Sequence, residues 1–403
     1  MTAQPEHVLV VGAGLGGLRT VEQLRAAGYQ GRISLAGAEV HPPYDRPPLS
    51  KQLLTGDWTA ERVVLRTEDG LDELGVRTHL GLRAVALRPG EVELSDGASL
   101  YADAIVVATG LVARTLPGQP AQVHTLRTLD DALALRTDLE KAASALVVGA
   151  GFIGAEVASA ARGRGVDVTV LEAAAAPAER ALGAEVAAVA ARLFAEAGVD
   201  LRTGVSITGF TDPGEAGVAV ELAGGEQVRG DLGVVGIGGR PDLDWLADTG
   251  VDTTAGLPCT ATGRVEGLDG VWAVGDVASW TDREGRRHRH EHWTSAGDQA
   301  AVVARDILGA ELPPPAVPYF WSDQFGLKIQ LIGRPELADS VVPLHGSGFD
   351  GGPVRGTVAG YLAGDRLVAV AGFGAARFIA RYRPLVAEGA DRAALEHTRA
   401  ALS

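Results

Sequence analysis

The positions of apolar residues predict the same local structure at two places in the chain. Residues 9–11 and 146–148 both read Leu-Val-Val, and glycines follow each run at once. Uninterrupted apolar runs are typical of parallel strands, because such strands are covered on both faces. Beyond the glycines the apolar positions take helical spacing, at Leu18, Val21 and Leu24 in the first copy and at Val157 and Ala161 in the second. The pattern therefore predicts strand, turn and helix in both places.

The two copies share a glycine pattern at a constant offset of 137 residues. In the first copy the G-x-G-x-x-G glycines are Gly12, Gly14 and Gly17, and in the second they are Gly149, Gly151 and Gly154. A further strand is expected after each helix, at 33–35 and 168–170. One strand–turn–helix–strand unit therefore occurs twice.

This glycine pattern has a physical reason in dinucleotide binding. The first glycine makes a tight turn, the second lets a pyrophosphate approach the backbone, and the third lets the helix pack closely on the strand. The helix N-terminus then offers free N–H groups and a positive dipole end to the phosphates. A single such motif is weak evidence, but two copies in the same structural context predict two dinucleotide sites.

The copies differ where the adenosine ribose is expected. In the second copy Glu172 ends the strand, 18 residues after Gly154, which suits the acid that accepts from ribose hydroxyls. A carboxylate repels a 2′-phosphate, so we expect NAD(H) rather than NADP(H). In the first copy Gly37 stands at the equivalent position, and Glu39 is the nearest acid. Glu39 is either a ribose ligand or a solvated loop charge, and the spacing does not decide between them.

Alternating and apolar stretches predict the remaining elements. They are a hairpin over 91–97, a buried strand over 104–110, strands within 206–228, a strand over 270–276, a helix over 295–308, a proline-rich linker over 312–318, strands over 328–332 and 357–372, and a helix over 375–386. Asp276 comes just past a strand, at the sheet edge where α/β proteins bind ligands.

Composition excludes several classes of function. The chain has 36 Lys and Arg against 51 Asp and Glu, a net charge of −15, which argues against binding to nucleic acid or to an anionic membrane. Its longest uncharged run, 142–155, is shorter than the roughly 20 residues of a membrane helix, and no signal-peptide pattern is present. We expect a cytoplasmic protein.

Cys259 is the one cysteine, which excludes an internal disulfide, a redox cysteine pair and an iron–sulfur site.

Several motifs together resemble one family, the FAD-dependent, NADH-using ferredoxin reductases of bacterial oxygenase and cytochrome P450 systems. The motifs are PYDRPPLSK at 43–51, Ala108-Thr109-Gly110, the second glycine motif ending at Glu156, Gly275-Asp276, Glu291-His292-Trp293 and FWSDQFG at 320–326. The resemblance runs from Val8 to about Ile332, and more loosely to the C-terminus. It implies an α/β fold with a discontinuous FAD-binding domain (1–110 and 240–315), an NAD-binding domain (111–239), both Rossmann-like, and a C-terminal α+β domain (316–403).

The resemblance also implies roles for individual residues. Those expected to bind FAD are Gly12, Gly14, Leu15, Gly16, Gly17, Gly37, Glu39, Arg46, Lys51, Ala84, Ala108, Thr109, Gly110, Arg127, Gly275, Asp276 and Trp293. Those expected to bind NADH are Gly149, Gly151, Ile153, Gly154, Glu156, Glu172, Arg180 and Gly238. Lys51 near the flavin N5, Glu156 and Trp293 are the implied catalytic residues. The chain departs from the family pattern at Gly37, which replaces an acid, and in the alanine-rich loop 173–176.

The missing cysteines decide between branches of this flavoprotein class. A disulfide reductase of this architecture needs two cysteines in the stretch that here reads Arg46-Pro47-Pro48-Leu49-Ser50-Lys51. Without them electrons must leave the flavin directly, and a flavin can accept hydride and release electrons singly. We therefore expect electron transfer to a [2Fe–2S] ferredoxin. The alternatives are a rubredoxin reductase, a flavin NADH oxidase, or a non-enzymatic redox sensor resembling apoptosis-inducing factor.

Other residues admit both a functional and an ordinary interpretation. The alternation of three histidines, His288, His290 and His292, could place them on one strand face as a metal site. They more simply belong to an arginine-rich loop, so we predict no metal. Cys259 is expected to be a structural thiol. Two arginine groups are candidates for docking an acidic ferredoxin: Arg283, Arg286, Arg287 and Arg289, and Arg377, Arg381 and Arg383. The alternative is that neighbouring acids balance these charges. The oligomeric state, monomer or homodimer, stays open.

Overall fold

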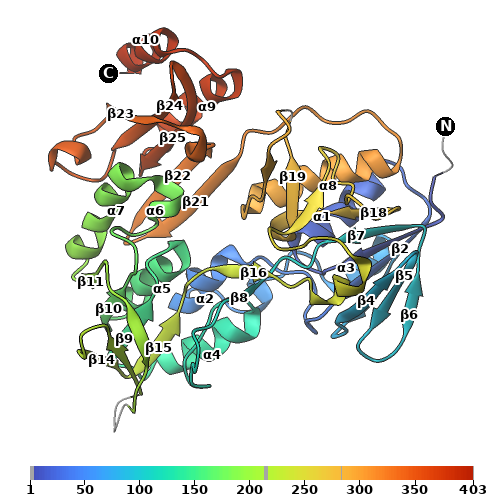
Figure 1. Ribbon diagram of the computed structural model, residues 1–403, viewed down its shortest axis with the longest axis horizontal. Coiled ribbons are helices and arrows are strands. Elements are labelled where there is room, and N and C mark those ends of the chain that lie inside the picture. The colour runs from blue at the N-terminus through green and yellow to red at the C-terminus, as the bar shows by residue number, and fades with distance from the viewer. Residues whose placement is uncertain (1–3, 213–216, 283, 403) are drawn as a thin grey trace. The chain divides into compact units, whose positions relative to one another are not determined.

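The chain of the computed structural model forms two compact units, described here separately (Figure 1). The structure describes residues 4–212, 217–282 and 284–402. The first unit comprises Met1–Asp45, Glu61–Val112 and Arg240–Ala316, and the second comprises Arg46–Ala60, Ala113–Gly239 and Val317–Ser403. Two short strands, β8 (Leu111–Ala113) and β16 (Gly239–Pro241), lie where the chain passes from one unit to the other.

A five-stranded parallel sheet, in the order β18–β7–β1–β2–β3, is the centre of the first unit. Its strands are β1 (His7–Val11), β2 (Arg32–Gly37), β3 (Val76–Leu80), β7 (Ala104–Val107) and β18 (Val271–Ala273). The remaining elements are α1 (Leu15–Ala26), α3 (Glu68–Glu73), β4 (Ala84–Arg88), β5 (Glu91–Leu94), β6 (Ser99–Tyr101), β17 (Leu257–Cys259), β19 (Ala278–Thr281), β20 (Arg287–His288) and α8 (Trp293–Ile307).

Strand β1 is apolar throughout because both of its faces are covered. Val8 and Val10 pack in a core with α1 and α8, whereas Leu9 and Val11 face a second core that includes the antiparallel strands β4 and β5. Helix α1 buries Leu18, Val21 and Leu24, the residues whose spacing predicted it. The strand predicted over 104–110 ends at Val107 (β7), and the hairpin predicted over 91–97 is formed by β5 and β6.

The second unit contains a four-stranded parallel sheet, in the order β11–β10–β9–β15. Its elements are α2 (Gln52–Thr55), α4 (Leu129–Leu139), β9 (Ser144–Val148), α5 (Phe152–Gly163), β10 (Asp167–Leu171), α6 (Glu179–Leu182), α7 (Ala184–Glu196), β11 (Asp200–Arg202), β12 (Ile207–Phe210), β13 (Val218–Leu222), β14 (Gln227–Gly230) and β15 (Leu232–Val235). Val147 packs with α4 and α5, and Leu146 and Val148 face the antiparallel sheet β12–β13–β14. In both units, therefore, helices cover one face of the parallel sheet and an antiparallel sheet covers the other.

The same unit ends in an antiparallel five-stranded sheet, drawn in orange and red in Figure 1, in the order β21–β22–β25–β24–β23. Its elements are β21 (Tyr319–Gln324), β22 (Leu327–Gly333), β23 (Ser340–His345), β24 (Val358–Ala363), β25 (Arg366–Phe373), α9 (Ala376–Glu388) and α10 (Arg392–Leu402). One face packs with α7 and the other with α9. The stretch 357–372, predicted to be strand, forms the two strands β24 and β25, and Gly364 and Asp365 turn the chain between them.

The predicted fold class is confirmed: two parallel α/β sheets and a C-terminal antiparallel α+β domain are present. In the described part of the chain, no helix has both the length and the apolarity needed to cross a bilayer.

Candidate dinucleotide and electron-transfer site

The first glycine turn, in the first unit, needs each of its glycines for a different steric reason. Gly12 has φ +117°, and a Cβ there would lie 2.2 Å from the carbonyl oxygen of Ala108. A Cβ on Gly17 would lie 1.9 Å from the carbonyl oxygen of Gly12. Apart from its chain neighbours, no atom of the described residues lies within 4 Å of a Cβ built on Gly14, so the backbone there is open to a ligand.

The second turn, in the second unit, has the same geometry. Gly149 has φ +97°, and its Cβ would lie 2.5 Å from the carbonyl oxygen of Gly236. A Cβ on Gly154 would lie 1.9 Å from the carbonyl oxygen of Gly149, and the space around Gly151 is open. Each turn therefore combines two glycines required by packing with one that exposes the backbone.

Both turns present an uncapped helix N-terminus. The N-cap residues of α1 and α5 are Gly14 and Gly151, and neither receives a side-chain cap among the described residues. Thr109, at the carboxyl end of β7, has a buried hydroxyl with no hydrogen-bond partner in the described part of the chain. Free helix N–H groups suit a pyrophosphate, and an unpaired buried hydroxyl suits a ligand that supplies its partner. These features fit a bound dinucleotide.

The end of β2 explains why glycine stands at position 37. A Cβ on Gly37 would lie 2.6 Å from the Cβ of Ala13, so a side chain here would strike the glycine turn. The next acid, Glu39, is half-buried, and its Oε2 accepts a 2.5 Å hydrogen bond from the Tyr44 hydroxyl. Glu39 is therefore held in place by its own loop.

The carboxyl end of β18 carries the second group of predicted FAD residues. Gly275 has φ +76°, and its N–H donates to the buried side chain of Gln299. Asp276 is half-buried, and Arg289 donates to its backbone carbonyl at 3.0 Å. Trp293 begins α8, and its Nε1 donates to Asp45 at 2.6 Å, so the indole ring is fixed by the motif that precedes Lys51 in sequence.

A buried ion pair joins two predicted catalytic residues in the second unit. The Lys51 Nζ lies 2.7 Å from Oε2 of Glu156, with the side chains 11% and 3% exposed. Lys51 also donates to the Pro47 carbonyl at 3.1 Å, and its third N–H has no partner among the described residues. Ser50 and Ser322 both donate hydrogen bonds to Glu156. Both serines lie within motifs that carry the family resemblance, at 43–51 and 320–326, but the sequence alone assigned no role to either.

Glu172 lies on the second glycine turn, as its spacing predicts. Its two carboxylate oxygens accept from the N–H groups of Ala150, at 2.6 Å, and Ala174, at 2.8 Å. The N–H of Ala178 donates to the Ala150 carbonyl, which brings the loop after β10 to the same turn. Arg180 is exposed at the start of α6, with no ion-pair partner among the described residues.

The structure divides the predicted site residues between the units. The first unit holds Gly12, Gly14, Leu15, Gly16, Gly17, Gly37, Glu39, Ala84, Ala108, Thr109, Gly110, Gly275, Asp276 and Trp293. The second holds Arg46, Lys51, Arg127, Gly149, Gly151, Ile153, Gly154, Glu156, Glu172, Arg180 and Gly238. Within the second unit Arg46 donates to the Arg127 carbonyl at 2.5 Å, and Ile153 is 44% exposed at the start of α5.

The two arginine groups differ in how their charges are compensated. Arg286 pairs with Asp282 and Glu284, Arg287 with Glu266, and Arg289 with Glu291; Arg283 lies outside the described residues. On α9, Arg377, Arg381 and Arg383 are exposed and have no carboxylate partner within 4 Å in the described part of the chain. The charges of the arginines at 286–289 are thus balanced by neighbouring acids, whereas the three arginines of α9 are available to an anionic partner.

The three alternating histidines lie next to one another. The rings of His288 and His290 stack with centroids 5.9 Å apart, those of His290 and His292 are tilted at 5.7 Å, and His288 bonds to Asp282. No cluster of three metal-ligating side chains is present among the described residues.

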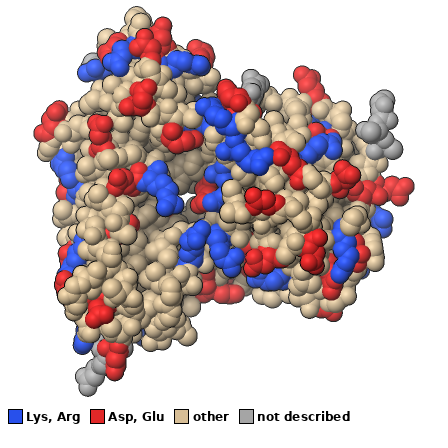
Figure 2. Space-filling view, in the orientation of Figure 1, with Lys and Arg blue, Asp and Glu red and all other residues tan. Residues whose placement is uncertain are grey.

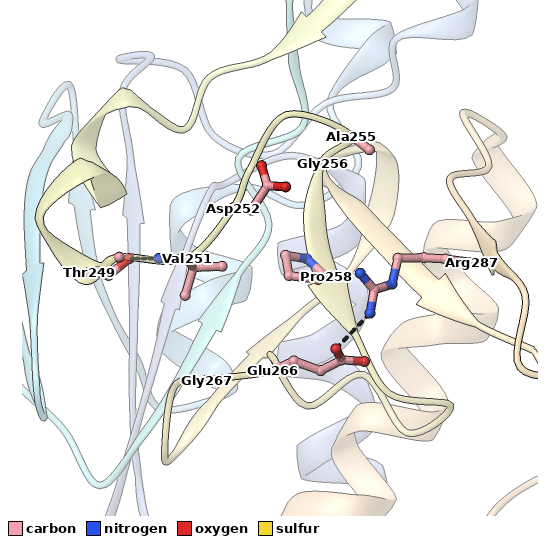
Figure 3. Close-up of a pocket in the computed structure, with 10 residues that line it drawn as sticks. Thr249, Val251, Asp252, Ala255, Gly256, Pro258, Glu266, Gly267 and Arg287 are labelled. Carbon is pink, nitrogen blue, oxygen red and sulfur yellow. Dashed lines mark hydrogen bonds and ion pairs between the residues drawn. The ribbon is translucent and has the colours of Figure 1, made fainter.

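A cavity of about 390 Å³ in the first unit is spanned by the Glu266–Arg287 ion pair (Figure 3). Its lining includes none of the predicted site residues.

Cys259 is expected to be inert. It is fully buried in β17, its thiol donates to the Leu257 carbonyl, and burial raises its pKa to about 12. Because the thiolate is the reactive form, iodoacetamide at pH 8 should leave the folded protein unlabelled and its turnover unchanged. Cys259→Ser, which keeps a donor for Leu257, should also turn over normally. A Cys259→Ser protein that binds FAD but has no activity would contradict direct electron transfer.

Comparison with known proteins identifies the class of this two-turn fold. The family model described as pyridine nucleotide-disulphide oxidoreductase matches residues 6–300, and the reductase C-terminal model matches residues 319–402. The chain belongs to the pyridine nucleotide-disulphide oxidoreductase family.

Among the proteins that the chain resembles are ferredoxin reductases. The chain is 38% identical over 353 residues to the ferredoxin reductase component of chlorobenzene dioxygenase from Cupriavidus sp. (strain PS12), covering 86% of this chain and 84% of the relative. It is 36% identical over 398 residues to the anthranilate 1,2-dioxygenase ferredoxin–NAD(+) reductase component from Burkholderia cepacia, covering 97% and 96%. The crystal structure of the covalent putidaredoxin reductase–putidaredoxin complex matches with a TM-score of 0.90 at 31% identity, covering 98% of each chain.

Proposed function

We propose that the protein is an NADH-dependent ferredoxin reductase that serves an oxygenase or a cytochrome P450. The observation that carries this proposal is that residues 46–51, where a disulfide reductase needs two cysteines, contain none, and that Lys51 of this stretch forms a buried ion pair with Glu156. The only thiol of the chain, Cys259, is buried in a strand of the first unit. FAD, when bound, can accept a hydride and release its two electrons one at a time. Electrons then pass to a [2Fe–2S] ferredoxin, as the names of the relatives suggest.

Residues of the first unit hold FAD in this proposal. The open backbone at Gly14 and the N-terminus of α1 bind the pyrophosphate, and the Asp276 carboxylate accepts from ribityl hydroxyls. Thr109 supplies its otherwise unpaired hydroxyl, and Trp293, fixed by Asp45, packs beside the flavin ring. We assign the FAD-binding domain to residues 1–110 and 240–315.

Residues 111–239 hold NADH in this proposal. The open backbone at Gly151 binds its pyrophosphate, and Glu172, oriented by two backbone N–H groups, accepts from the adenosine ribose. Ile153 and Arg180 are exposed beside this turn. Lys51, whose ammonium is paired with Glu156, would contact the flavin. Residues 316–403 form the C-terminal domain.

We further propose a cytoplasmic location, because the reaction draws on the cellular NADH pool.

The acceptor preference tests the proposed function. NADH-reduced protein should be reoxidised by a [2Fe–2S] ferredoxin far faster than by rubredoxin or oxygen. A preference for rubredoxin or oxygen would favour the other two electron-transfer enzymes. Slow flavin reduction with a long-lived NAD complex would instead favour a redox sensor.

The coenzyme preference should depend on Glu172. The native protein should strongly prefer NADH, because the carboxylate accepts from a 2′-hydroxyl and repels a 2′-phosphate. The double variant Glu172→Ala/Ala173→Arg should shift the ratio of kcat/KM toward NADPH by about 10-fold or more, equivalent to about 1.4 kcal/mol. Steady-state kinetics with both coenzymes measures this.

Ala173→Arg alone is the matched control for this change. It adds the same positive charge but keeps the carboxylate, so the preference for NADH should persist. Equal use of both coenzymes by the native protein would contradict the assignment of Glu172.

A further inference from the structure

Helix α5 presents two polar side chains, one turn apart, to the hairpin formed by β21 and β22. Glu156 accepts a hydrogen bond from the hydroxyl of Ser322, and Ser159 accepts one from the N–H of Phe325 at 2.7 Å. Gln324 and Leu327 are paired at the end of the hairpin, so its turn consists of Phe325 and Gly326, with φ +49° and +70°. Phe325 packs against Phe194 at 5.0 Å. The hairpin therefore has a fixed position on α5.

The hydroxyl of Ser322 is oriented by a second buried group. Ser322 has no exposed surface, and the Nε2 of Gln324 donates to its Oγ at 2.9 Å. Because that donor occupies an acceptor position of the serine oxygen, the serine proton is free to point at Glu156. Gln324 is itself 3% exposed, so water does not compete for this chain of hydrogen bonds.

The donors around Glu156 leave neither carboxylate oxygen without a partner. Ser322 donates to Oε1, and Ser50 donates to Oε2, which also pairs with the Lys51 ammonium at 2.7 Å. A carboxylate taken out of water is costly unless it is both paired with a cation and hydrogen-bonded. Lys51 contacts only Oε2, and the last side-chain torsion of a glutamate has a broad range of allowed values. Without the two serines, the carboxylate could therefore rotate about this torsion.

We propose that Ser50 and Ser322 are positioning residues for hydride transfer, which fix the Glu156 carboxylate so that it holds the Lys51 ammonium in one place. They act through Glu156 rather than on the reacting atoms. The inference rests on the proposed function, in which Lys51 contacts the flavin. It also gives the C-terminal sheet a part in the site, because Ser322 lies on its edge strand β21.

Two measurements on the FAD-loaded protein test this role. The first is a double-mutant cycle of unfolding with Ser322→Ala, Glu156→Gln and the double variant. We expect the two sites to be coupled by about 10-fold in the unfolding equilibrium constant, or about 1.4 kcal/mol. The second is flavin reduction by NADH in single turnover. In Ser322→Ala the limiting rate should fall about 10-fold while the Kd for NADH stays the same, since positioning is lost but binding is not.

Ser159→Ala is the matched control, because it removes a hydrogen bond between the same helix and hairpin without touching Glu156. It should show neither the coupling to Glu156 nor the loss of rate. Ser50→Ala provides a second variant of the same kind as Ser322→Ala and should also slow reduction. Equal behaviour of Ser322→Ala and Ser159→Ala in both measurements would overturn the proposal.

Lys51→Met separates this proposal from the proposed function. If Lys51→Met reduces its flavin at the native rate, the role of Lys51 fails, whereas the unfolding cycle still reports whether Ser322 holds Glu156. If Lys51→Met is slow and the serine variants are not, the positioning role alone is wrong.

Discussion

Gly154→Ala should retain FAD and lose reduction by NADH. The added Cβ would lie 1.9 Å from the carbonyl oxygen of Gly149, so the second turn must open and its backbone N–H groups lose their geometry. Loss of two hydrogen bonds to the pyrophosphate, each worth about 1.4 kcal/mol, weakens NADH binding about 100-fold. Flavin absorbance of the purified variant and its NADH-dependent bleaching measure the two properties separately.

Gly17→Ala should instead lose FAD. Its Cβ would lie equally close to the Gly12 carbonyl oxygen, so the first turn opens and the protein should purify largely without FAD. Gly163→Ala, at the far end of α5, is the matched control, because a Cβ there meets no described atom outside its own stretch of helix within 4 Å. It should keep both cofactors, with stability equal or higher, since alanine favours a helix. Loss of FAD from Gly154→Ala but not from Gly17→Ala would reverse the assignment of the turns.

Reversing two charges on α9 should impair ferredoxin reduction. The double variant Arg377→Glu/Arg381→Glu should raise the KM for an acidic ferredoxin about 10-fold or more, because the encounter of charged proteins is steered by local potential. Turnover with ferricyanide, a small acceptor, should change little. Rising salt should slow ferredoxin reduction in the native protein, since screening shortens to about 8 Å at 0.15 M, and should barely affect reduction by NADH.

The positions of the charges support α9 as the docking element. Arg377 and Arg381 are exposed one turn apart on α9, on a chain whose net charge is −15. Figure 2 shows basic side chains interspersed with acidic ones over the face in view. Because the overall charge repels an acidic partner, docking needs cations without an internal counter-charge. The three α9 arginines meet that condition among the described residues, and Arg286 and Arg287 do not.

Arg286→Glu/Arg287→Glu is therefore the comparison variant. It reverses the same number of charges on arginines already paired with acids of the first unit, so its effect on ferredoxin KM should be clearly smaller. A larger effect from this pair than from the α9 pair would move the docking surface to the first unit.

The parts of the molecule that the sequence predicted are those set by local geometry. The two glycine turns were recognisable because each glycine is needed by atoms a few residues away or by the next strand. Both faces of β1 and β9 are covered, so their apolar runs were visible without any knowledge of the partners. Glu172 was found because the length of the intervening helix fixes its distance from the turn.

The features that the sequence did not predict depend on contacts between distant segments. Ser322 is 166 residues from Glu156, and no periodicity relates the two. The arginines at 286 and 287 differ from those of α9 only in their neighbours, one of which, Glu266, is 21 residues away. The turn at Gly364 and Asp365 separates two strands that pair with each other, a contact that the apolar pattern of 357–372 does not specify.

A single-turnover experiment tests most directly that electrons pass from NADH through FAD to ferredoxin without a thiol step. FAD-loaded protein, treated with iodoacetamide, is mixed anaerobically with one equivalent of NADH and then with oxidised [2Fe–2S] ferredoxin. We predict that the flavin is bleached and that about two ferredoxins are reduced for each NADH, since hydride carries two electrons. A flavin that NADH reduces but ferredoxin does not reoxidise, or reoxidation lost on alkylation, would contradict the account.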